Sequence, residues 1–107
     1  MEADMAAKQI DSYRIDYYSG PDNFLSAVIL LSSNNIGVGR INFIKDGNAI
    51  RANREIANGI LVINFHESKF SEILDLLRNE TPLFIDLNTQ HGIGSIQTDN
   101  EPIGEDE

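Results

Sequence analysis

The chain has 107 residues, of which 8 are Lys or Arg and 17 are Asp or Glu, so its net charge at pH 7 is −9. This length is enough for one domain that buries a core without disulfides or a metal. The chain contains no Cys, which excludes a disulfide framework, thiolate zinc ligation and a cysteine nucleophile. No apolar run approaches the ~20 residues that span a bilayer, and residues 1–10 lack the basic and apolar regions of a secretory signal. We therefore predict a cytoplasmic protein without membrane contact.

The first part of the chain predicts a flexible lead-in followed by three strands. Residues 1–11 are polar and rich in Ala, which is typical of a loosely held terminus. Alternating apolar residues predict strands over 12–18, 24–31 and 36–44. Asn34 and Asn35 tolerate positive φ and predict a tight hairpin between the second and third of these strands. The apolar parity changes around Gly39, which predicts a bulge there.

The central part of the chain contains two further turn signals, Asp46-Gly47 and Asn58-Gly59. Three hairpins in succession predict a meander. The stretch 48–57 between the last two turns is the least apolar part of the expected sheet. It is consistent with either an edge strand or a partly irregular loop.

The last part of the chain predicts a strand, a helix and a hairpin. An apolar run over 60–65 predicts a buried strand. The apolar spacing over 68–79 predicts an amphipathic helix with Ser68 as its N-cap, which ends before Pro82. Strands are expected over 83–88 and 93–97. These last two strands either extend the main sheet or form a separate flap.

Together these elements predict an α+β fold: a mostly antiparallel twisted β-meander with one amphipathic helix packed on one face, followed by a β-hairpin. The predicted domain spans residues 12–98. Residues 99–107 hold five of the seventeen acids, and a tail of this composition is typical of disorder. Without those acids the net charge is only −4.

Four basic side chains fall in the predicted meander: Arg40, Lys45, Arg51 and Arg54. Guanidinium groups on a twisted sheet match phosphate and carboxylate groups, so these residues are candidates for binding an anion or a nucleic acid. The alternative is that they protect sheet edges from pairing with other chains. Two aromatic residues, Tyr18 and Phe84, stand at polar positions of their strands and are candidates for a stacking or interface surface. The other aromatic residues are expected in the core.

The signals for a metal or for catalysis are weak. His66 lies at the junction of strand and helix, and Asp86 or His91 could join it in a histidine–carboxylate site. The alternative is a partly exposed histidine near a helix start. No metal and no cofactor is predicted.

Two resemblances carry further expectations. A meander that leads into an amphipathic helix over residues 12–79 is similar to the order of elements in the whirly and transcriptional-coactivator family of single-stranded-DNA binders. This resemblance implies a DNA-binding sheet, whereas the acidic composition departs from the basic face that such binding needs. Residues 76–80 (LLRNE) and 101–105 (EPIGE) resemble small uncharacterised bacterial proteins, which implies no activity.

We therefore predict a non-catalytic binding or protein-interaction module. The expected partners are a protein or a second copy of the chain, associating through an edge strand or the exposed side of the helix. The first alternative is a single-stranded nucleic-acid-binding protein that uses the four basic residues. The second alternative is a small metal-dependent enzyme around His66.

Overall fold

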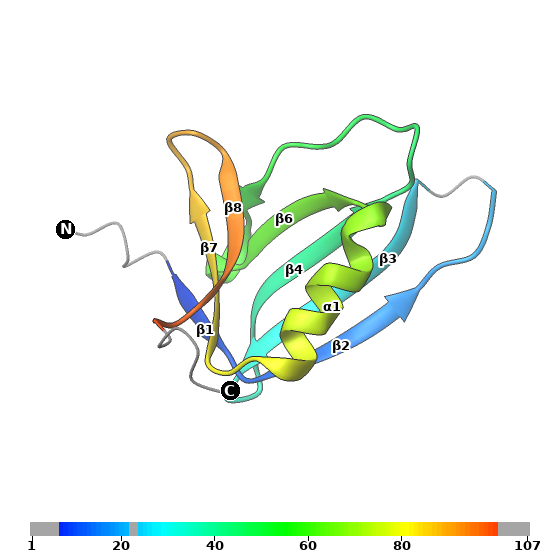
Figure 1. The fold of residues 1–107 in the computed structure, drawn as a ribbon. Coiled ribbons are helices and arrows are strands. Elements are labelled where there is room, and N and C mark those ends of the chain that lie inside the picture. Colours follow the sequence, from blue (N-terminus) through cyan, green and yellow to red (C-terminus); the bar gives the residue numbers. More distant parts are fainter. Residues whose placement is uncertain (1–6, 22–23, 101–107) are drawn as a thin grey trace.

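The computed structural model describes residues 7–21 and 24–100, which form an α+β fold with a larger and a smaller sheet (Figure 1). The larger sheet has the strand order β2-β3-β4-β6-β5 and the smaller one β1-β7-β8. The strands are β1 (Lys8–Ile10), β2 (Ser12–Tyr17), β3 (Leu25–Ser33), β4 (Ile36–Ile44), β5 (Arg54–Glu55), β6 (Leu61–His66), β7 (Leu83–Asn88) and β8 (Ile93–Thr98). The helical segments are η2 (Ala57–Gly59), η3 (Glu67–Lys69) and α1 (Phe70–Asn79). The predicted fold class is confirmed.

The hairpin between β3 and β4 forms as its sequence predicts. Asn34 has φ 53° and Asn35 has φ 66°, so both turn residues adopt the left-handed backbone that a tight hairpin needs. Leu31 pairs with Gly39 and the next residue along β3 pairs with Gly37, which leaves Val38 as an extra residue in β4. The bulge predicted near Gly39 is confirmed.

The hairpin predicted at Asp46-Gly47 is wrong, because β4 pairs in parallel with β6. Residues 45–53 instead form an irregular loop, and β5 returns along the outer edge of β6. The first three residues of β6 are all buried, so this strand is covered on both faces and takes an interior place in the sheet, between β4 and β5. The polar β5 is left at the edge. Asn58 and Gly59, both with positive φ, make the predicted turn between β5 and β6.

The helix lies across one face of the larger sheet, which we call the inner face. Its residues Phe70, Ile73 and Leu77 pack into the main core, and Figure 1 shows α1 in front of β3 and β4. The helix ends at Asn79 as expected. Ser68 lies inside the 3-10 turn η3 and is not an N-cap, because the polar turn Glu67–Lys69 extends the helical segment toward β6.

The last two strands form the predicted hairpin, but they belong to the smaller sheet, where β1 pairs with β7. β1 lies within the range 1–11 that was expected to be a flexible lead-in. Ile10 is only 8% exposed and is part of the main core, and this burial is what holds β1 in place. Residues 1–6 and 101–107 lie outside the described residues, so the rest of the lead-in and most of the acidic tail stay predictions.

Two glycines allow the smaller sheet to approach the inner face of the larger one. A Cβ atom placed on Gly39 would lie 2.7 Å from Ile85 Cδ1, and one on Gly94 would lie 2.2 Å from Ile63 Cδ1. Both isoleucines are buried, at 0% and 1% exposure. The close contact between the two sheets therefore requires glycine, which has no Cβ atom, at positions 39 and 94.

We expect Gly94→Ala to lower the free energy of unfolding by about 2 kcal/mol, because the new methyl group overlaps the buried side chain of Ile63. Urea unfolding measures the loss. The Ile63→Ala background removes the overlapping atoms, so there the same change is expected to cost far less. Equal losses in both backgrounds would show that Gly94 acts through its backbone and not through this contact.

None of the helices formed by residues 7–21 and 24–100 is long and apolar enough to cross a membrane.

Candidate functional site

The face of the larger sheet opposite α1, the outer face, carries two of the predicted basic residues in one row. Arg40 on β4 pairs with Val62 on β6, and Val62 pairs in turn with Arg54 on β5. Directly paired residues of neighbouring strands point to the same face. Arg40 and Arg54 therefore flank the buried Val62, with Arg40 half-buried and Arg54 exposed.

The Arg40 side chain is held by a buried pair of carboxamides. Its Nε donates to Asn42 Oδ1 at 2.7 Å, and Asn42 Nδ2 donates to Asn64 Oδ1 at 3.0 Å. Asn42 and Asn64 are the buried polar residues among those described, at 8% and 7% exposure. In the described part of the chain, the terminal nitrogens of Arg40 donate no hydrogen bond. The fork of this guanidinium is thus oriented by the protein and left available to a ligand.

The same network fastens the irregular loop 45–53. Asn64 Nδ2 donates to the carbonyl oxygen of Ala52 at 3.0 Å, and the Asn64 amide N–H donates to Asn53 Oδ1 at 2.7 Å. Asn53 Nδ2 donates to the carbonyl oxygen of Gly92 at 2.9 Å, in the turn between β7 and β8. The Asn53 side chain therefore continues the edge of β6 beyond the two residues of β5 and joins the loop to the smaller sheet.

The other two predicted basic residues contact the segment that joins β2 to β3. The Arg51 guanidinium carbon is 4.0 Å from the centre of the Phe24 ring. Phe24 itself packs on the outer-face residues Val28 and Ile44. Lys45 Nζ donates to the carbonyl oxygen of Gly20 at 2.9 Å. We call Arg40, Lys45, Arg51 and Arg54 the basic cluster.

The basic cluster has no acidic partner within the described residues, where the ion pairs are Arg14–Asp16 and Lys69–Glu72. The structure thus does not bring the four predicted residues into one continuous group. It separates them into two subsets: Arg40 and Arg54 form the row beside Val62, whereas Arg51 and Lys45 are engaged by Phe24 and Gly20.

The weak metal candidates are not brought together. His66 Nε2 lies 3.0 Å from the carbonyl oxygen of Asn48, whereas His91 lies in the turn between β7 and β8. Asp86 stands on β7, where its Oδ1 is buried and has no hydrogen-bond partner within residues 7–21 and 24–100. A search of the same residues finds no group of three or more His, Cys, Asp and Glu side chains that could hold a metal.

The two aromatic candidates lie on different sheets. Tyr18 follows β2, is 41% exposed, and donates its backbone N–H to Ser26. Its position continues the alternation of Arg14 and Asp16, so it belongs to the outer face. Phe84 is half-buried on the smaller sheet, between Gln9 and Gln97. The two therefore do not form one surface.

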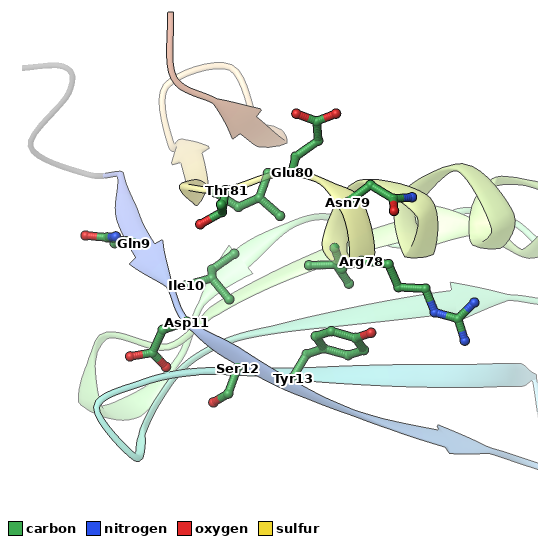
Figure 2. Close-up of a pocket in the computed structure, with 11 residues that line it drawn as sticks. Gln9, Ile10, Asp11, Ser12, Tyr13, Arg78, Asn79, Glu80 and Thr81 are labelled. Atoms are coloured by element: carbon green, nitrogen blue, oxygen red, sulfur yellow. The ribbon is translucent and has the colours of Figure 1, made fainter. Parts of the chain in front are cut away.

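A groove of about 540 Å³ lies between the β1–β2 corner and the last turn of α1. Figure 2 shows the Tyr13 ring under the end of the helix, with Asp11 and Arg78 toward opposite ends of the opening. Asp11 Oδ2 already accepts a hydrogen bond from the backbone N–H of Asn34 at 2.8 Å. The lining thus offers a mixture of apolar and polar groups and no matched set of donors for one ligand.

Comparisons with protein-family models, with curated proteins and with solved structures found no match to this chain. The resemblances to the whirly and transcriptional-coactivator family and to small bacterial proteins therefore stay predictions.

Sequence reasoning missed the carboxamide pair, although a signal for it exists. The tripeptide Ile-Asn-Phe occurs at 41–43 and again at 63–65. The structure pairs these two segments in parallel and in register, so that Asn42 lies beside Asn64. A polar amide in the middle of two identical apolar strand segments indicates that the amides pair with each other.

Proposed function

We propose that the protein is a non-catalytic interaction module whose basic cluster binds an acidic segment of a protein partner. The observation that carries this proposal is the row in which Arg40 and Arg54 flank the buried Val62 without acidic partners among the described residues. Arg and Lys side chains at neutral pH supply hydrogen-bond donors and positive charge, but no group that accepts a proton. The chemistry that the cluster offers is therefore binding.

The held guanidinium of Arg40 supports this proposal further. Its Nε is fixed by Asn42, so fewer rotamers are lost when the terminal nitrogens bind a carboxylate in the two-pronged geometry that Arg favours. A short acidic segment needs only a few such contacts. Cytoplasmic residence stays a prediction within this proposal.

The second candidate function is binding of single-stranded nucleic acid, and it is favoured by the position of Tyr18. This exposed ring stands on the outer face, the same side as Arg40 and Arg54, where a base could stack while arginines contact the backbone. We rank it second because a net charge of −9 repels a long polyanion and the cluster has four cations.

Fluorescence anisotropy with a labelled Asp/Glu-rich peptide at low salt tests the proposal. We expect binding by the wild type, and a loss of affinity of at least about tenfold in Arg40→Gln/Arg54→Gln, since two charge-assisted contacts are removed. The matched control is Lys69→Gln/Arg78→Gln on the helical segment, which changes the net charge equally and should retain affinity.

The same titration with a labelled oligothymidine separates the two functions. Binding of the oligonucleotide that falls steeply with salt and is lost in Tyr18→Ala, without binding of the peptide, would favour the second candidate. If neither probe binds at low salt, the basic cluster is not a polyanion site.

A further inference from the structure

β2 is an edge strand of the larger sheet with an exposed second side. It pairs with β3 along its whole length and, within the described residues, with no strand on its other side. Its inner-face aromatic residues are only partly covered: Tyr13 is 37% and Tyr17 is 68% exposed. The apolar alternation of this strand predicts that both side chains lie on its apolar face. Their exposure follows from the position of β2 at the edge of the sheet.

The direction of the backbone groups of β2 follows from its register. Tyr18 donates its N–H to the carbonyl oxygen of Ser26, the residue opposite it in the register, which marks the even-numbered residues of β2 as the hydrogen-bonded pairs with β3. Hydrogen-bonded and non-hydrogen-bonded pairs alternate along an antiparallel ladder. The N–H and C=O groups of Tyr13, Ile15 and Tyr17 therefore point away from the sheet.

We infer that this edge binds a second copy of the chain, through antiparallel pairing of β2 with β2 of the second copy about a twofold axis at Ile15. In this register the outward groups of Ile15 meet those of its counterpart, and those of Tyr13 meet those of Tyr17. Every outward donor and acceptor of the three residues then has a partner. This inference goes beyond the proposed function and does not depend on it.

The charges of β2 select this register over its neighbours. With Ile15 at the axis, Arg14 lies directly opposite Asp16 of the second copy, twice in the dimer. A shift to an axis at Arg14 or at Asp16 keeps the hydrogen-bond pattern but sets like charges against each other, which is destabilising. In the single chain these two side chains already pair with each other at 3.2 Å, and both are accessible to a partner.

The inner face beside β2 has room for the second copy. Tyr17 remains largely exposed although its ring centre is 5.3 Å from that of Phe70 on α1, so the helix covers only the side of β2 nearest to β3. The pairing places Tyr13 and Tyr17 of opposite copies side by side on this face. Aromatic cross-strand pairs add to the stability of an antiparallel contact.

Sedimentation of the full chain over a series of concentrations tests the inference. We expect the wild type to approach twice the mass of the 11.9 kDa chain as concentration rises. Arg14→Asp and Asp16→Arg should each weaken association by at least about tenfold, because each sets like charges opposite in both pairs. An equimolar mixture of the two variants should restore dimers, since every pair is then attractive.

A control and a second measurement locate the contact. Reversing the exposed Lys69–Glu72 pair by Lys69→Glu/Glu72→Lys should leave association unchanged. Amide exchange at Tyr13, Ile15 and Tyr17 should slow with concentration, while exchange at Arg14 and Asp16 should not change. A wild type that stays monomeric throughout, or single variants that associate as strongly as the wild type, would overturn the inference. Circular dichroism verifies that each variant is folded.

Discussion

Replacing Phe43 by Ala is expected to lower the free energy of unfolding by about 3–5 kcal/mol, the largest single effect that we predict. Phe43 lies on β4, is fully buried, and contacts rings from both the sheet and the helix. Its ring centre is 4.9 Å from that of Phe70 at an interplanar angle of 75°, and 6.3 Å from that of Phe65. Truncation therefore removes buried apolar area, the edge-to-face contact with Phe70 and the stacked contact with Phe65 together, and leaves a cavity.

Urea unfolding with a shared m-value measures this effect. Tyr17→Ala is the control, because this ring also contacts Phe70 but is 68% exposed, and its loss should cost under about 1 kcal/mol in the monomer. Similar losses in the two variants would mean that the contact with Phe70 and not the burial of Phe43 dominates. The test is made where the protein is monomeric, so that association does not contribute.

Asn64→Leu is expected to lower the free energy of unfolding by about 2–4 kcal/mol, because it leaves two polar groups without partners. Asn42 Nδ2 loses its acceptor, and the carbonyl oxygen of Ala52 loses its donor. Asn42 is 8% exposed, so water does not readily replace the lost hydrogen bond. Loop 45–53 should loosen, which amide exchange in the loop would report.

The double variant Asn42→Leu/Asn64→Leu separates the hydrogen bond from the burial. Removing both carboxamides leaves no unpaired amide between β4 and β6, so the double variant should be more stable than the sum of the two single losses indicates. Strict additivity would contradict the pairing seen in the structure. The peptide titration of the same variants reports whether Arg40 loses its orientation when Asn42 is absent.

Local signals were sufficient to predict most elements of this fold. Three of these signals act over a few residues, so their outcomes can be derived from neighbouring side chains. They are the left-handed residues Asn34 and Asn35, the change of apolar parity near Gly39, and the helical apolar spacing that ends before Pro82. The α+β class follows from these elements. The parallel pairing of β4 with β6 could not be derived in this way, because it is decided by which distant segment takes the place beside β4.

The candidate site was predictable only as a list of side-chain types. The cluster of Arg40 and Arg54 could be proposed from charge, but their common row depends on Val62 lying between them, which is a product of the parallel pairing. The predicted meander does not pair β4 with β6. It therefore does not place Asn64 beside Asn42, the residue that holds Arg40. Conversely, the exposure of Tyr17 follows from the edge position of β2, and nothing in its own apolar alternation indicates that position.

The pairing of β1 with β7 affects how the protein matures during synthesis. Lys8 and Ile85 are partners, so β1 is made well before the strand with which it pairs. Until α1 and β7 have been made, the apolar side of the nascent sheet, with Ile41 and Ile63, has no cover. Folding of this domain on the ribosome therefore cannot be completed in the order of synthesis, and the incomplete domain exposes apolar surface until β7 is in place.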